Sequence, residues 1–156
     1  MTVFYTKPVL RDLSQGARIA YVRQFRHMTQ EELGEKIEMS PGRRRNRICR
    51  YERGTRNPKD DRVEKMAEVL EINEAMIKSY DFKDPMDIVY ILLWLEDVSP
   101  DYILKSSGAE SFVNKTSTCI KKALKEWQSV KNKLKKGEIS ETEYTEWKLT
   151  HIWEYR

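Results

Sequence analysis

The sequence has few of the residues that build disulfide frameworks, metal centres and phosphate-binding loops. Its two cysteines, Cys49 and Cys119, have no CxxC or Cys/His spacing, so we expect both to be small buried hydrophobes. Its two histidines, His27 and His151, stand in no metal or nucleophile spacing, and its 6 glycines form no phosphate-binding loop. We therefore expect no cofactor, no metal site, no catalytic residue and no enzymatic activity.

Long apolar runs are also missing. The run IVYILLWL, residues 88–95, is well short of the roughly 18 residues that a membrane span requires. The chain also begins without the apolar stretch of a secretory signal. We expect no membrane partner and a cytoplasmic location. The 156 residues allow one domain of ordinary size or two small ones.

Negative charge is scarce in the first half. Residues 1–72 carry 16 Lys+Arg against 11 Asp+Glu, a net charge of +5. Residues 73–156 carry 13 Lys+Arg against 14 Asp+Glu, a net charge of −1. An excess of positive charge confined to one half is the electrostatic pattern expected of a nucleic-acid-binding domain.

The stretch from Thr29 to Pro58, TQEELGEKIEMSPGRRRNRICRYERGTRNP, carries the most information. Thr29 and Glu32 have the spacing of a capping box, which predicts the start of a short helix. A second predicted helix follows, and it is dense in arginine with a single acid, Glu52. Self-repulsion among these side chains opposes folding unless a polyanion such as a nucleic acid lies along them. The arginines are Arg43, Arg44, Arg45, Arg47, Arg50 and Arg53.

From about Gly16 to Ile72 the sequence resembles the Cro/CI-type (XRE) helix-turn-helix family, which includes phage repressors. The matching pieces are RIAYVRQFRHMTQEELGEKI, ICRYERGTRNP and VEKMAEVLEI. The resemblance implies an all-α fold with an N-terminal lambda-repressor-like bundle that binds double-stranded DNA. It also implies a transcriptional regulator, typically a repressor, that binds palindromic operators as a homodimer.

The segment between Ser40 and Ile48 is about four residues longer than in the usual family member. The extra residues lengthen the turn or start the recognition helix earlier. A connection of this length is similar to that of regulators carried by integrative elements of Gram-positive bacteria.

Site residues follow from a register in which Ile48 and Tyr51 face inward. We expect four side chains to reach bases, where arginine bonds guanine and asparagine bonds adenine: Arg44, Arg45, Asn46 and Arg50. We expect phosphate contacts from Thr29, Gln30, Arg43, Arg47, Arg56, Asn57 and Lys59. The alternative is that the whole run neutralises phosphates and reads no sequence.

One further pair is implied by the resemblance. An arginine at the position of Arg23 pairs in this family with the glutamate of the YERG segment, here Glu52, and joins the first helix to the recognition helix. The alternative is a solvated Arg23.

Around these residues, helices are expected from near Ser14 to Arg26, after Pro58, and after a cap at Asn73. The residues before them, Val3, Phe4 and Tyr5, are expected to fold back on the core. In the alternative interpretation, Lys7 or Arg11 forms an arm along a DNA groove.

The second half is expected to be helical. Asp84-Pro85 begins a helix of residues 86–97 whose apolar run is either buried or an association surface. Residues 99–115 form a connection, a helix follows until Gly137, and Ser140 with Glu143 caps a final helix. We therefore predict a helix-turn-helix domain at 1–80 and a helical region at 81–156 for association or partner binding.

Two other functions stay open at this point. The chain is alternatively a mobile-element antitoxin or inhibitor that holds a protein partner through residues 99–156, while the helix-turn-helix autoregulates. A further alternative is an architectural factor with little sequence preference. The lysines from Lys121 to Lys136 are either a solvated helix face or a second nucleic-acid surface.

Overall fold

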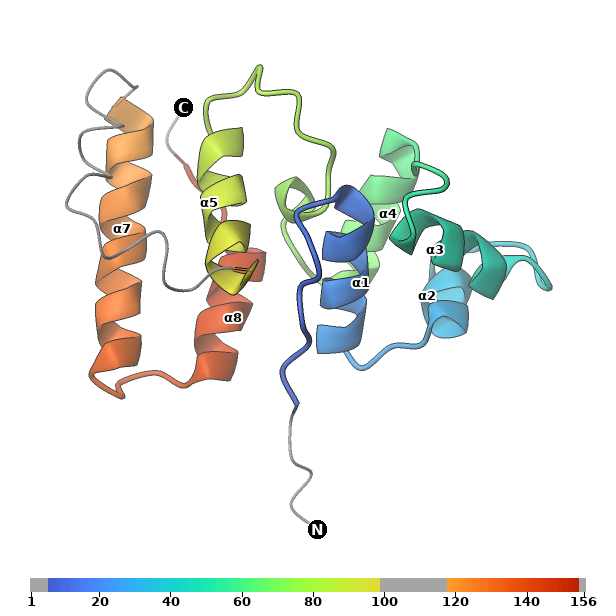
Figure 1. Cartoon of the computed structure of the whole chain (residues 1–156), viewed down its shortest axis with the longest axis horizontal. Helices are drawn as coiled ribbons and strands as arrows, with labels where there is room; N and C mark the ends of the chain where they lie inside the picture. The colour runs from blue at the N-terminus through green and yellow to red at the C-terminus, as the bar shows by residue number, and fades with distance from the viewer. Residues whose placement is uncertain (1–5, 99–117, 155–156) are drawn as a thin grey trace, which may run out of the picture. The chain divides into compact units, whose positions relative to one another are not determined.

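The computed structural model describes residues 6–98 and 118–154, and every regular element within these ranges is a helix (Figure 1). The expected all-α fold is confirmed. The chain divides into two compact units, a first unit Met1–Ser79 and a second unit Tyr80–Arg156. The expectations for Val3 to Tyr5 and for the connection at 99–115 lie outside the described residues. No helix in the described ranges is long and apolar enough to cross a membrane.

The first unit consists of four α-helices and a short 3-10 helix. They are α1 (Gln15–Phe25), α2 (Gln30–Lys36), α3 (Arg44–Glu52), α4 (Asp60–Leu70) and η1 (Glu74–Met76). Thr29 and Glu32 form the predicted capping box on α2, and Asn73 caps η1 as predicted. Ser14 caps α1, which begins where the sequence predicts a helix. Each cap satisfies a backbone amide that has no partner within its helix.

The core of the first unit joins all of its α-helices. Its innermost side chains come from α1, α3 and α4, from the middle of α2 and from the residue that follows α2: Ile19, Val22, Leu33, Ile37, Ile48, Met66 and Leu70, none more than 1% exposed. Burying each such side chain contributes roughly 1.5–3 kcal/mol relative to leaving it in water. This core fixes the helices against one another and so determines which side of α3 faces solvent.

Two close contacts tie α1 to the rest of the unit. Arg18 is 2% exposed, and its guanidinium donates to the carbonyls of Met76 and Lys78 at 2.7 and 2.8 Å. Gly16 lies so close to the end of α3 that an added Cβ would stand 2.3 Å from the Tyr51 carbonyl oxygen. A larger residue at Gly16 would therefore force α1 and α3 apart.

The second unit contains α5 (Asp87–Val98), α7 (Thr118–Lys135) and α8 (Glu141–Thr150). Ser140 and Glu143 form the predicted capping box, and Gly137 follows α7 with a φ of 72°. The core contains Trp94, Trp127, Tyr144 and Trp153. Because these rings fill the unit's own interior, they do not offer an aromatic surface to a partner, and partner binding through residues 99–156 stays a prediction. Ile152 lies beyond the end of α8 at Thr150 and is 69% exposed.

A polar network lies inside the second unit. The Trp127 indole donates to the Tyr144 hydroxyl, which donates to Glu96 Oε2, both at 2.7 Å. Lys131 bonds the other Glu96 oxygen, and Lys148 donates to Asp97 at 2.7 Å. Burial and the Glu96 carboxylate raise the pKa of the Tyr144 phenol. The two lysines balance the two carboxylates, which makes burial of these charges tolerable.

Candidate nucleic-acid interface

Helix α3 is held in place from its inner side. Ile48 and Tyr51 are buried, as the register predicts. The Glu52 carboxylate accepts hydrogen bonds from Arg23 Nε at 2.5 Å, Arg23 Nη2 at 3.0 Å and Gln30 Nε2 at 2.8 Å. Arg23 and Glu52 are only 11% and 8% exposed at their side chains. One carboxylate thus joins α1, α2 and α3.

The predicted outward orientation is wrong for Arg44. An added Cβ on Gly34 would stand 2.7 Å from Arg44 Cβ, so α2 and α3 touch at this position. Arg44 Nε donates to the Met39 carbonyl at 3.0 Å, and its Nη1 lies 3.5 Å from Glu35 and 3.7 Å from Glu31. Arg44 is four residues before the buried Ile48, and this spacing places both side chains on the same side of the helix.

The longer connection forms a turn. Residues 37–43 separate the end of α2 from Arg44, and two of them, Glu38 and Gly42, have positive φ values of 59° and 79°. Arg43 makes no side-chain capping bond, and instead Glu31 accepts from the Arg45 backbone amide at 3.1 Å. The additional residues therefore lengthen the turn, and α3 begins only at Arg44.

The outward side of α3 has two flanks. On one flank a hollow of about 320 Å³ is lined entirely by predicted DNA-contacting residues, and these are Arg43, Asn46, Arg47, Arg50 and Arg56. Asn46, Arg50 and Arg56 are exposed, so their polar ends are available to a ligand. The structure thus gathers two of the four predicted base contacts with three of the predicted phosphate contacts.

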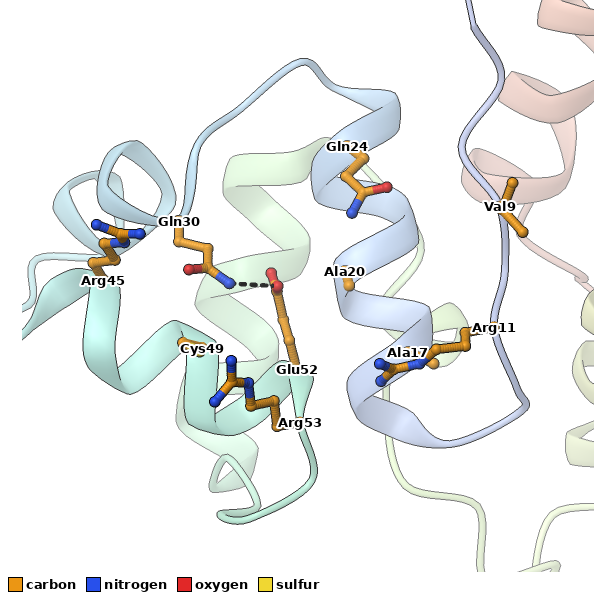
Figure 2. Close-up of a pocket in the computed structure, with 10 residues that line it drawn as sticks. All are labelled: Val9, Arg11, Ala17, Ala20, Gln24, Gln30, Arg45, Cys49, Glu52 and Arg53. Atoms are coloured by element: carbon orange, nitrogen blue, oxygen red, sulfur yellow. Dashed lines mark hydrogen bonds between the residues drawn. The ribbon is translucent and has the colours of Figure 1, made fainter.

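The other flank opens toward α1 (Figure 2). A hollow of about 370 Å³ lies there, and its basic lining residues are Arg11, Arg45 and Arg53. Figure 2 shows Arg11 reaching across α1 toward α3. Arg53 was missing from the predicted site, although it follows Asn46 by seven residues, a spacing that returns to the same helix face. Cys49 also lines this hollow and is half-buried, so the expectation of a buried side chain was wrong for it.

Thr29 and Gln30 have structural partners. The Thr29 hydroxyl accepts from the Glu32 amide at 3.1 Å, and the Gln30 side chain bonds Glu52. The hydrogen bond from the Thr29 amide lowers the pKa of the Glu32 carboxyl, which keeps a negative charge at this end of α2. That charge disfavours a phosphate there. The structure does not bring Thr29 or Gln30 into the hollow lined by Arg56.

The loop after α3 contains the remaining predicted phosphate contacts. Gly54 adopts a φ of 71° and lets the chain leave the helix in a left-handed conformation. Asn57 and Lys59 follow as exposed residues, and Lys59 immediately precedes α4. They lie outside the lining of both hollows.

Comparison with family models matches residues 19–77 to the helix-turn-helix family. Comparisons with curated proteins and with solved structures found no match. The matched segment begins in α1, contains all of α2, α3 and α4, and ends just after η1. Residues 19–77 therefore form a Cro/CI-type helix-turn-helix domain, and the chain is a DNA-binding transcription regulator.

Proposed function

We propose that the protein is a sequence-specific repressor that inserts α3 into the major groove of its operator. The observation that carries this proposal is the division of α3 into two sides. Its inner side is fixed by Ile48, Tyr51 and the Arg23–Glu52 pair, while its outer side presents arginines and Asn46 to solvent. A rigid helix with polar, forked side chains along one face suits recognition of base edges.

The outward residues divide into two roles. Arg45, Asn46 and Arg50 read bases, since an arginine fork fits guanine O6 and N7 and an asparagine amide fits adenine N6 and N7. Arg53 joins them because it is exposed on the same side of α3. Each such bidentate pair discriminates against the wrong base by roughly 1–3 kcal/mol.

Phosphate contacts surround this reading face. Arg43, Arg47 and Arg56 line one hollow beside Asn46, where a backbone phosphate would meet three guanidinium groups. Asn57 and Lys59 extend the contact along the loop that follows α3. Such contacts fix the position of the helix on the duplex and carry no sequence information.

Homodimer formation belongs to the same proposal, because two copies on a palindromic site double the number of bases read. Within α5, an apolar stripe remains half-buried, and its members are Ile88, Ile91, Leu92 and Leu95. The spacing of three to four residues places them on one helix face. This stripe is where we propose that self-association occurs, and the mass in solution with and without operator DNA tests it.

The test is selection of bound sequences from a random DNA pool at a stated salt concentration. The wild-type chain is expected to select a defined motif, and Asn46→Ala and Arg50→Ala are each expected to relax it at particular bases. Lys65→Ala is the matched control, since it removes an exposed positive charge from α4 and not from α3. Selection of no motif by the wild-type chain would refute sequence-specific reading.

Repression is tested with the selected motif placed over a promoter that drives a reporter. The wild-type chain is expected to lower reporter expression, and Asn46→Ala is expected to restore it. An increase in expression with the wild-type chain would identify an activator instead.

A further inference from the structure

The exposed charged residues of helix α7 are all lysines. Within Thr118–Lys135 the sequence has six lysines and one acid, Glu126. Five of these lysines are exposed, and so is the next residue after the helix: Lys121, Lys122, Lys125, Lys133, Lys135 and Lys136. The other exposed residues from 120 to 136 are neutral: Gln128, Ser129 and Asn132. Glu126 is half-buried and lies 3.1 Å from His151, so it is not part of this lysine face.

The lysine face consists of two groups of three lysines, one near each end of α7. At 100° per residue, the six lysines fall within one side of the helix, opposite the buried Ile120, Ala123 and Trp127. Lys121 and Lys136 are fifteen residues apart, which at a rise of 1.5 Å per residue gives a length of roughly 22 Å. Double-stranded DNA carries one negative charge per roughly 1.7 Å of axis, so a surface of this length faces several phosphates.

An isolated solvated helix does not favour this pattern. Exposed helices commonly gain stability from acid and base pairs three or four residues apart. In α7 only Lys122 has this spacing to an acid, Glu126, and Lys121 and Lys125 are four apart with like charge. Lys121 also lies in the first turn, where the helix dipole disfavours a cation and where α7 has no acid. The helix dipole favours Lys133 and Lys135 near the C-terminal end of α7. It does not account for the exposed lysines in the N-terminal half of this helix.

Three acids of the second unit are bonded to groups outside the lysine face. Glu96 and Asp97 bond Lys131 and Lys148 inside the bundle, and Glu143 bonds the backbone amide of Ser140. None of these carboxylates neutralises the lysine face. The net charge of −1 over residues 73–156 therefore conceals a strongly positive surface on one helix.

We infer that the lysine face of α7 is a second DNA contact, directed at backbone phosphates. Lysine ammonium groups act as point charges on phosphates, whereas the forked arginines of α3 can bond base edges as well as phosphates. Since both units belong to one chain, the second contact forms at an effective concentration that reaches millimolar for a short flexible connection, and weak contacts then suffice. The lysine face adds affinity and no sequence preference. This inference goes beyond operator reading by α3 and does not require it.

The test uses the full chain and a random-sequence DNA duplex, with affinity measured over a range of salt concentrations. The variant carries Lys121→Gln, Lys125→Gln and Lys133→Gln, and the control carries Lys36→Gln, Lys65→Gln and Lys83→Gln. Both variants lose three exposed lysines, and in the control these come from α2, α4 and the segment before α5. For the α7 variant, we expect the slope of log affinity against log salt to decrease in magnitude by about 2 to 3. Each phosphate contact contributes about 0.9 to this slope.

The control variant is expected to keep the wild-type slope. Equal slopes in the α7 variant and the control would overturn the inference. A second outcome would also overturn it: the α7 variant keeps the wild-type slope but differs from the wild type in its mass in solution without DNA. That result would show that the lysine face binds an acidic surface of a second copy. Because the duplex has random sequence, the slope is measurable whether or not α3 selects a motif. Tryptophan fluorescence verifies that the second unit, which contains Trp127 on α7, remains folded.

Discussion

Glu52 shows how a single side chain connects the fold to the interface. Its carboxylate accepts three hydrogen bonds from α1 and α2, while its neighbours along α3 face solvent as candidate DNA contacts. A residue in this position affects DNA binding by orienting α3, without touching a base. The effect of a Glu52 substitution on folding can be separated from its effect on DNA binding only by measuring stability and affinity together.

Removing one partner of the Arg23–Glu52 pair is expected to destabilise the first unit. Arg23→Ala leaves the Glu52 carboxylate buried without the guanidinium that balances its charge, at a cost of roughly 3–5 kcal/mol in the free energy of unfolding. Replacing both residues, Arg23→Met with Glu52→Leu, is expected to recover most of this loss because no uncompensated charge remains. Urea denaturation followed by circular dichroism measures both variants.

The chain supplies an internal control for that experiment. All four tryptophans, at positions 94, 127, 147 and 153, belong to the second unit. Tryptophan fluorescence therefore reports on the second unit, while circular dichroism reports on helices of both. An Arg23→Ala chain whose helical signal unfolds at the wild-type urea concentration would contradict the proposed role of the pair.

Tyr144 offers a comparable test inside the second unit. Tyr144→Phe removes the acceptor of the Trp127 indole and the donor to Glu96, which is expected to cost about 1–3 kcal/mol. In the folded chain the pKa of the Tyr144 phenol is raised above 10.0, the value for the unfolded chain. The contribution of the neutral phenol to the stability of the fold is therefore complete below pH 10 and is lost as the pH rises further. Wild type and variant are therefore expected to converge in stability above pH 10.

Fluorescence-detected urea denaturation at pH 8 and at pH 10.5 measures this difference. Thr142→Ala, an exposed position of α8, is the control and is expected to change stability little at either pH. A gap between wild type and Tyr144→Phe that stays constant through alkaline pH would show that ionisation of Tyr144 is not coupled to unfolding.

At the scale of elements, helix starts were the most predictable feature. Thr29, Asn73 and Ser140 cap helices as expected, and the first helix begins next to Ser14 as expected, because a cap depends on a few neighbouring residues. The inward side of Arg44 could have been predicted from its spacing of four residues to Ile48, whereas its close contact with Gly34 depends on how near α2 approaches α3 and could not. The buried Arg18 escaped prediction for a similar reason: two of its carbonyl partners lie 58 and 60 residues away along the chain.

Gly34 is therefore expected to control how α3 sits on α2. Gly34→Ala places a Cβ 2.7 Å from Arg44 Cβ, an atom next to the backbone that moves only if α3 moves. We expect a loss of roughly 1–3 kcal/mol in stability from overpacking, and weaker DNA binding in the molecules that remain folded. Circular dichroism and DNA titration of the same samples measure the two effects.

The matched control is Lys36→Ala, which changes an exposed residue of the same helix. Its stability is expected to stay within about 0.5 kcal/mol of wild type, as for ordinary surface substitutions. Wild-type stability and affinity in Gly34→Ala would mean that α2 and α3 adjust to the added methyl group without displacing the reading face.

At the scale of the whole molecule, the two kinds of basic residue are concentrated on different helices. Arginine dominates α3, where forked donors can distinguish bases, and lysine dominates α7, where point charges suit phosphates. The overall net charge of +4 does not reveal this division. The total salt dependence of DNA binding sums both surfaces, whereas the selected motif reports only on residues that touch bases.

That distinction predicts opposite results for two neighbours in one hollow. Arg56→Ala is expected to make the plot of log affinity against log salt shallower by about 0.9 and to leave the selected motif unchanged. Asn46→Ala carries no charge change, so its slope is expected to match wild type while discrimination at one base falls by roughly 1–3 kcal/mol. Relaxed selection by Arg56→Ala would instead place that guanidinium on a base. A shared loss of affinity, with neither slope nor motif altered, would mean that the hollow maintains the shape of the turn and lies away from the DNA.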